Sequence, residues 1–179
     1  MAHPDRVDRI TEQWRGERPE LDTTAMAVFG RIFRLSRIAG DEMERVYAGH
    51  GIGRPEFDVL ATLRRAGEPF QLSPGALAAS MMASTGGTTA RLDRLERAGL
   101  AARFPSPTDR RSVQVRLTPK GREIVDRAVA AGLAEQQRML SHLPPQTQRQ
   151  LADLLREALA PLEKDGPRPL RGGDPQGSR

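Results

Sequence analysis

The segment DRRSVQVRLTPKG, residues 109–121, most constrains what this 179-residue chain can fold into. Val113, Val115 and Leu117 alternate with polar residues, as they do in a half-buried β-strand. The Thr-Pro pair that follows is a typical helix start. Residues 100–104 predict a partner strand. We therefore expect a two-stranded hairpin with a basic tip, placed directly before a long helix.

The rest of the chain is predicted to be helical. Hydrophobic residues recur at helical spacing in seven segments: residues 5–18, 26–47, 55–66, 74–81, 84–99, 119–143 and 151–159. We expect Ser84 or Thr85 to cap the helix that precedes the hairpin. A short helix, a turn, a second helix and a hairpin predict a mainly α fold with a small β-wing, the winged helix–turn–helix.

The charge and composition narrow the class of function. The net charge is +5, and residues 84–122 hold nine Lys or Arg against three Asp or Glu, so the basic surplus is local. A local basic region favours a polyanionic partner. The chain has no cysteine, its three histidines lack metal-ligand spacing, and we find no phosphate-loop or nucleophile motif. We expect neither a cofactor nor a metal, and not an enzyme. The sequence offers no membrane span or signal peptide, which predicts a cytoplasmic protein.

Two groups of residues are predicted to contact double-stranded DNA. Small and hydroxyl side chains at a helix start can approach base edges and phosphates closely, and arginines can follow them on the same helix. An arginine at a wing tip can enter the minor groove or bind phosphates, and a neighbouring aspartate can orient it. The predicted DNA-binding residues are Ser84, Thr85, Gly86, Thr88, Thr89, Arg91, Arg94, Asp109, Arg110 and Arg111.

From about residue 25 to 160 the chain resembles the MarR family of bacterial transcription regulators. The resemblance is carried by RLERAGL at the end of the second helix, and by the wing, whose D-x-R matches Asp109 and Arg111. It implies a homodimer built from N- and C-terminal helices that binds a pseudo-palindromic operator. Two recognition helices would then enter successive major grooves roughly 34 Å apart.

An additional helix at residues 5–18 resembles the urate-responsive, PecS/HucR-like subgroup of that family. The resemblance implies a ligand site made of Trp14, Asp58, Arg65 and Arg91. Asp58 and Arg65 are two helical turns apart and share one face, and arginine binds planar anions well. Arg91 belongs to the predicted recognition helix. An anion that attracts it would therefore move that helix and release the operator.

Three alternatives remain open. The arginines Arg64, Arg65 and Arg91 also suit a tricarboxylate such as trans-aconitate or citrate. Asp58 and Arg65 can instead form a structural pair, with Trp14 as a core anchor and Arg91 as a phosphate contact. The basic region by itself also fits a sequence-tolerant architectural DNA-binding protein, which would show little preference for one operator.

These expectations divide the chain into five parts. They are an extra N-terminal helix (1–20), a dimerisation helix (21–53), the winged helix–turn–helix (54–118), C-terminal dimerisation helices (119–164) and a disordered tail (165–179).

Overall fold

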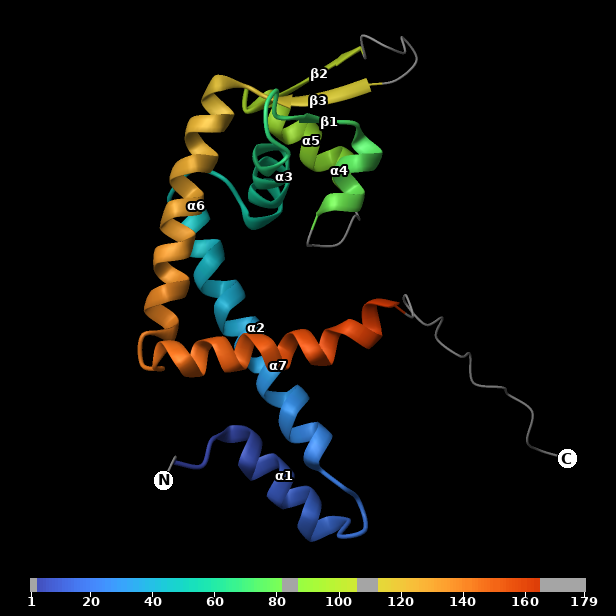
Figure 1. Cartoon of the computed structure of the whole chain (residues 1–179), viewed down its shortest axis with the longest axis vertical. Helices are drawn as coiled ribbons and strands as arrows, with labels where there is room; N and C mark the ends of the chain where they lie inside the picture. Colours follow the sequence, from blue (N-terminus) through green and yellow to red (C-terminus); the bar gives the residue numbers. More distant parts are fainter. Residues whose placement is uncertain (1–2, 82–86, 106–112, 165–179) are drawn as a thin grey trace, which may run out of the picture. The chain divides into compact units, whose positions relative to one another are not determined.

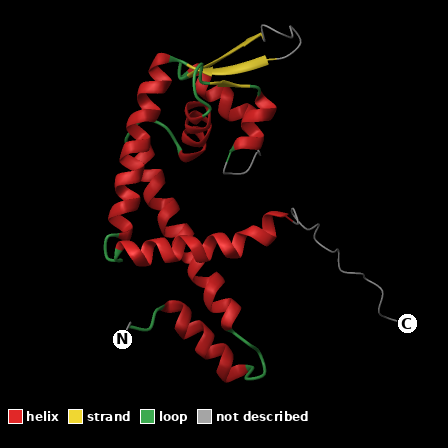
Figure 2. Cartoon of the chain, viewed as in Figure 1, coloured by secondary structure: helices red, strands yellow, loops and turns green. Residues whose placement is uncertain are grey.

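The computed structural model describes residues 3–81, 87–105 and 113–164. It confirms a mainly helical fold with one small antiparallel sheet (Figure 1, Figure 2). The elements are α1 (Arg6–Glu17), α2 (Thr24–Ala48), α3 (Arg54–Arg65), β1 (Gln71–Leu72), α4 (Pro74–Ser80), α5 (Thr88–Arg97), β2 (Ala101–Pro105), β3 (Val113–Leu117), α6 (Pro119–Leu140) and α7 (Pro145–Lys164). The chain forms two compact units, Met1–Gln137 and Arg138–Arg179, which we describe separately.

The sheet has the strand order β1-β3-β2. The predicted hairpin is confirmed, with Ala101 opposite Leu117 at its base and Pro105 opposite Val113 at the other end. The strand β1, in which Gln71 and Leu72 pair with the far side of β3, was not predicted from the sequence. Two residues are too few to show the alternation that identifies a strand. With β1 added, the sheet and its neighbouring helices form a winged helix–turn–helix.

One hydrophobic core joins the sheet to the surrounding helices. Its largest fully buried side chains come from five elements: Val59, Leu60 and Leu63 of α3, Leu77 of α4, Leu92 and Leu95 of α5, Val115 of β3 and Val125 of α6. The two leucines of α3 and the two of α5 lie three residues apart, which places them on one face of each helix. The opposite face of α5 is therefore left open to solvent.

Helix α5 begins at Thr88, later than the predicted start at Ser84 or Thr85, which lie outside the described residues. Gly87 is its N-cap and has a left-handed backbone conformation, with φ of +75°. Glycine adopts this conformation without steric cost. It cannot continue a right-handed helix, so α5 starts immediately after it.

Helix α1 is attached to the first half of α2. Asp5 caps α1 by accepting hydrogen bonds from the backbone N–H groups of Val7 (2.6 Å) and Asp8 (3.0 Å). Arg31 of α2 binds the carboxylates of Asp5 (3.0 Å) and Asp8 (2.6 Å). Val7 packs against Gly30, where an added Cβ would lie 2.9 Å from the valine. The predicted N-terminal helix is therefore a packed part of the first unit.

The predicted cap of the long helix α6 is confirmed. The Thr118 hydroxyl accepts the N–H of Gly121 (3.0 Å) and donates to the carbonyl of Gly99 (2.8 Å). In the second unit, α7 begins at Pro145, and Gln148 donates to the carbonyls of Leu140 (3.1 Å) and Leu143 (3.0 Å). Within the described segments, no helix combines the length and apolar character needed to cross a membrane.

Candidate DNA-binding surface and ligand site

The exposed side of α5 carries four of the predicted DNA-binding residues. Thr89 and Arg94 are exposed, and Thr88 and Arg91 are half-buried. Arg94 also bridges to α3, because its Nη2 lies 2.6 Å from the carboxylate of Glu56. An arginine already bound in this way must share or leave its partner to reach a phosphate. Arg94 would therefore have to give up or share Glu56 to contact DNA.

The other six predicted DNA-binding residues lie outside the described residues. They are Ser84, Thr85 and Gly86 before α5, and Asp109, Arg110 and Arg111 between β2 and β3. The second group lies in the sequence between Pro105 and Val113, which form the last described pair of the hairpin. The predicted contacts of both groups stay predictions.

Arg103 connects the wing to α5, a contact that the sequence pattern did not predict. Its guanidinium lies 2.7 Å from Asp93 and also forms an ion pair with Glu96, and its backbone N–H donates to Glu96 (2.9 Å). Asp93 and Glu96 are three residues apart on α5 and so share a face. That acidic pair was the available signal in the sequence. The link fixes the base of the wing against α5.

Two of the predicted ligand residues, Arg65 and Arg91, lie near enough to a third, Asp58, for their charges to act on it. The Asp58 carboxyl on α3 is half-buried, and burial raises its pKa above the usual range. The positive charges of Arg54, Arg91 and Arg65 act in the opposite direction and lower the same pKa. Arg54 and Arg65 belong to α3 and Arg91 to α5. The structure thus places an aspartate within the field of arginines from two helices.

The residues next to Asp58 are held by specific contacts. Arg65 donates from Nη2 to the Thr62 hydroxyl (2.9 Å) and to the carbonyl of Ser80 (2.7 Å), where α4 ends. Tyr47 of α2 stacks on the Phe57 ring with 3.8 Å between centroids. Burial and the charge of Asp58 both raise the pKa of Tyr47. The hydroxyl of Tyr47 therefore stays protonated at neutral pH.

Trp14 is the predicted ligand residue that the structure does not bring to Asp58. It lies on α1, its side chain is 44% exposed, and α1 packs against α2. Among the described residues, no ring contact or side-chain hydrogen bond joins the indole to the three charged residues. The alternative of a core anchor is wrong, because a core side chain is not 44% exposed.

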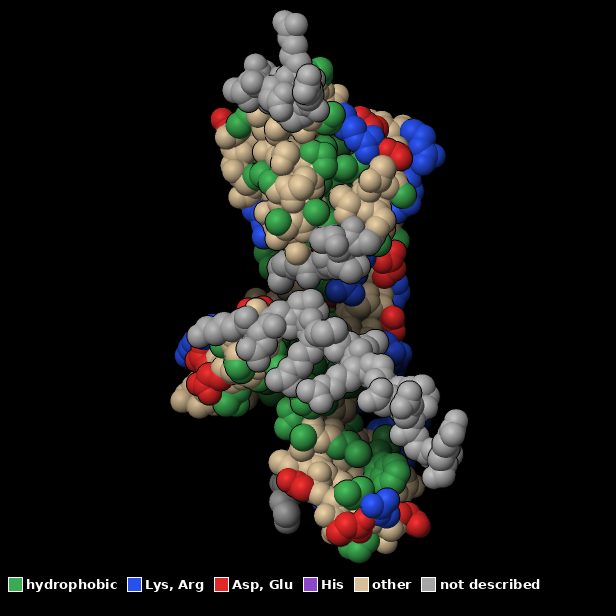
Figure 3. Space-filling model, turned by 90° about the vertical axis from the view of Figure 1, so that its right-hand side faces the viewer, with side chains coloured by type: hydrophobic (Ala, Val, Ile, Leu, Met, Phe, Trp, Pro, Cys, Tyr) green, Lys and Arg blue, Asp and Glu red, His purple; other side chains and the backbone are tan. Residues whose placement is uncertain are grey.

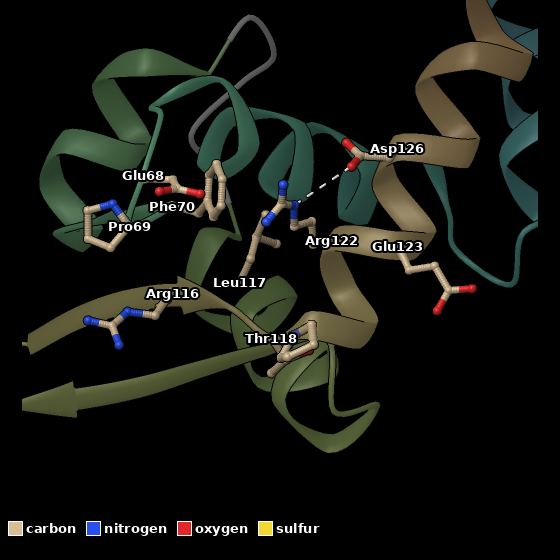
Figure 4. Close-up of a pocket in the computed structure, with 10 residues that line it drawn as sticks. Glu68, Pro69, Phe70, Arg116, Leu117, Thr118, Arg122, Glu123 and Asp126 are labelled. Carbon is tan, nitrogen blue, oxygen red and sulfur yellow. Dashed lines mark ion pairs between the residues drawn. The ribbon is translucent and has the colours of Figure 1, made fainter.

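Arg64 does not belong to this cluster, contrary to the tricarboxylate alternative. Its Nε lies 2.7 Å from Asp126 of α6, and its guanidinium lies over the Phe70 ring at 4.9 Å. Arg122 also approaches Phe70, at 4.7 Å, and pairs with Asp126 (Figure 4). A cavity of about 640 Å³ opens beside Phe70, with both acidic and basic side chains at its edge. Arg64 thus connects α3 to α6.

Comparison with known proteins agrees with this architecture. The sequence profile described as MarR family matches residues 50–112. The chain is 37% identical over 155 residues to HTH-type transcriptional regulator PecS of Dickeya dadantii (strain 3937), covering 87% of this chain and 93% of the relative.

Two solved structures share the fold. One is AbsC, a MarR family transcriptional regulator from Streptomyces coelicolor, with a TM-score of 0.70 and 22% identity over 81% of this chain and 95% of AbsC. The other is a mutant MarR from E. coli in complex with operator DNA, with a TM-score of 0.66 and 25% identity over 76% of this chain and 97% of that chain. With this fold, and with 37% identity to PecS over most of both chains, the protein belongs to the MarR family of transcriptional regulators.

Proposed function

We propose that this protein is a ligand-responsive transcriptional regulator that binds a pseudo-palindromic operator as a homodimer. Family membership identifies a DNA-binding regulator rather than an enzyme. The likeness to a MarR protein in complex with operator DNA supports specific operator binding over the architectural alternative. In the proposed complex, α5 enters the major groove and the wing contacts the adjacent backbone or minor groove. Repression is the expected sign of regulation.

Each proposed DNA contact follows from the chemistry of the side chain. Thr88 and Thr89 lie in the first turn of α5, and their short side chains let the helix approach base edges closely. Their contacts with the bases contribute to sequence preference. Arg110 and Arg111 at the wing add affinity for phosphates, oriented by Asp109. The remaining proposed contacts are Ser84, Thr85, Gly86, Arg91 and Arg94.

Exposed hydrophobic side chains support the proposed dimer. Helix α2 exposes Met26, Phe29, Phe33 and Ile38, and α7 of the second unit exposes Leu154, Leu159 and Leu162. Hydrophobic side chains are visible at the surface in the lower part of the space-filling view, where α1 and the start of α2 lie (Figure 3). Apolar surface of this extent is typical of an interface. We propose that residues 21–53 and 119–164 supply it.

We propose that the regulator is released by a small anion such as urate or another purine, bound by Trp14, Asp58, Arg65 and Arg91. The observation that carries this proposal is the half-buried Asp58 carboxyl within the field of arginines from α3 and α5. Asp58 accepts hydrogen bonds from the N–H groups of such a ligand, and the arginines bind its anionic oxygen. Trp14 of α1 supplies an aromatic surface that can stack on a planar ring.

In this proposal, ligand binding changes the affinity for the operator through the position of α5. Arg91 lies on α5, and Arg65 is bonded to the carbonyl at the end of α4, so the site touches both helices of the helix–turn–helix. An anion that draws Arg91 toward Asp58 favours one position of α5. If that position does not fit the major groove, the ligand shifts the population away from the DNA-binding state.

The ligand class can be argued from Asp58. A tricarboxylate brings several negative charges next to a carboxylate that burial already disfavours, whereas a purine offers N–H donors to the same group. Arg64, part of the tricarboxylate argument, is engaged with Asp126. The purine is therefore our first proposal, and trans-aconitate or citrate is the second.

A DNA mobility shift with the protein's own upstream region tests the proposal. The complex is titrated with urate, xanthine, citrate and trans-aconitate, and scrambled DNA of equal length is the control. We expect a preference for the operator on the order of 10³-fold, and release by urate or xanthine. Release by a tricarboxylate alone would favour the second ligand class. Equal binding to both DNAs would overturn the proposed operator recognition.

A further inference from the structure

Arg54 is an arginine of the Asp58 cluster that the resemblance did not include. It is the first residue of α3 and lies one helical turn before Asp58, so the two side chains share a face. Its charge lowers the pKa of Asp58 more than that of Arg91 or Arg65 does. It also acts on Tyr47, whose pKa it lowers. Arg54 therefore lies where α2 and α3 meet beside the proposed ligand site.

Contacts with α2 determine where the Arg54 side chain lies. Its backbone N–H donates to the Glu44 carboxylate (3.1 Å). Glu44 thus accepts a hydrogen bond from an N–H group at the start of α3 that has no acceptor within the helix. The guanidinium lies one turn away along α2, at Gly40. A Cβ added to Gly40 would be only 2.9 Å from Nη1 of Arg54. The absence of a side chain at Gly40 thus makes room for the guanidinium.

The neighbouring arginines have stronger ties to the protein. Arg65 donates to Thr62 and Ser80, and Arg64 pairs with Asp126. Arg54 is an exposed residue. Among the described residues, no carboxylate lies within ion-pair distance of its guanidinium. Arg54 can therefore bind an incoming anion without first breaking an ion pair of that kind.

We propose that Arg54 binds the anionic group of the ligand held at Asp58, and that the space left at Gly40 favours this position of the Arg54 guanidinium. This inference rests on the proposed function. The ligand is a planar anion that offers an N–H group to Asp58 and a negatively charged oxygen to Arg54. The bound ligand then contacts both Arg54, which lies beside Gly40 of α2, and Arg91 of α5.

Two substitutions test this inference in the full-length protein. Arg54→Gln removes the charge, and Gly40→Ala displaces the guanidinium while the charge stays. Arg127→Gln is the matched control, because Arg127 is an exposed arginine of α6 paired with Glu123. Calorimetric titration with urate, and with trans-aconitate in parallel, measures ligand affinity. Thermal melting and operator binding without ligand report on the fold.

We expect Arg54→Gln to weaken urate binding about 10- to 100-fold, the usual loss when a hydrogen bond to a charged group is removed. Gly40→Ala should weaken urate binding less than Arg54→Gln does. The Gly40→Ala variant should melt at the same or a higher temperature than the unsubstituted protein, because alanine favours a helix. Arg127→Gln should bind as the unsubstituted protein does, and all three variants should keep their operator affinity.

Two results would overturn the role of Arg54 while leaving the proposed ligand response intact. One is unchanged urate affinity in Arg54→Gln. The other is a loss of urate affinity accompanied by lower melting temperature and weaker operator binding, which would assign Arg54 a structural role. Failure of the unsubstituted protein to bind either anion would instead overturn the proposed ligand response, and the role of Arg54 with it.

Discussion

The Asp58 carboxyl is half-buried, and burial is the largest influence on its raised pKa. A carboxyl group with a raised pKa stabilises the fold when it is protonated, and this contribution is lost as the pH rises through the folded-state pKa. At neutral pH an ionised Asp58 therefore lowers the stability of the ligand-free protein. Sites that bind ligands often carry such a cost.

We expect Asp58→Asn to abolish the urate response and to raise the melting temperature of the ligand-free protein at pH 7 by about 1–3 °C. The gain should shrink as the pH falls toward the ordinary pKa of 3.8, because the native carboxyl becomes protonated. Thermal melts at pH 7 and pH 4 measure both effects. Asp41→Asn is the control, since Asp41 is exposed on α2 and paired with Arg37. A lower melting temperature for Asp58→Asn at pH 7 would contradict this prediction.

At the scale of elements, the contact between the wing and α6 depends on Gly121. A Cβ added there would lie 1.9 Å from the carbonyl oxygen of Leu100, an atom of the backbone that cannot rotate away. We expect Gly121→Ala to destabilise the fold by about 2–3 kcal/mol, because the first turn of α6 must shift. Denaturant unfolding measures the loss.

Gly75→Ala is the matched control for Gly121→Ala. Gly75 lies in α4, and an added Cβ would meet nothing within 4 Å. Because alanine favours a helix, this variant should be as stable as the unsubstituted protein or gain about 0.5–1 kcal/mol. Equal stability of the two variants would show that the close approach to Leu100 is relieved at little cost.

Helix α5 and the wing are expected to contribute differently to DNA binding. Arg111→Ala should weaken binding to matched and scrambled operators alike, because it removes a phosphate contact. Thr89→Ala should weaken binding to the matched operator by about 1–3 kcal/mol and leave scrambled DNA little affected. Mobility shifts on both DNAs distinguish the two. Equal losses on both DNAs for Thr89→Ala would remove it from base recognition.

The elements found from the sequence are those with long periodic patterns. Leu92 and Leu95 identified α5, and Val113, Val115 and Leu117 identified β3, because burial of one face imposes a helical or strand period. The two-residue strand β1 has no period to detect. The start of α5 was misplaced, because Ser84 and Thr85 are good caps whereas Gly87 acts through its left-handed backbone.

The site was only partly predictable for a related reason. The resemblance supplied all four ligand residues, and spacing along α3 showed only that Asp58 and Arg65 share one face. Arg54 satisfies the same spacing but was not chosen, because its role depends on Gly40 in another helix. Contacts between helices such as this one, or between Arg64 and Asp126, have no signature in a single sequence.

At the scale of the whole molecule, the exposed hydrophobic residues of α2 point to a partner. Phe33 is 69% exposed, although phenylalanine is usually among the more buried residues. It lies 6.0 Å from Phe29 between ring centroids, so the two form an aromatic pair on the surface of α2. Such a pair favours burial against a second copy of the chain.

We expect Phe33→Asp to convert the dimer into a monomer, because it places a charge where the partner's apolar surface would pack. Loss of the dimer should weaken operator binding by about 10²-fold or more, since the two half-sites are no longer bound by linked domains. Light scattering after size exclusion, and mobility shifts, measure the two effects. Val113→Asp, an exposed hydrophobic residue of β3, should keep the dimer mass. A dimeric Phe33→Asp that binds operator normally would place the interface elsewhere on the chain.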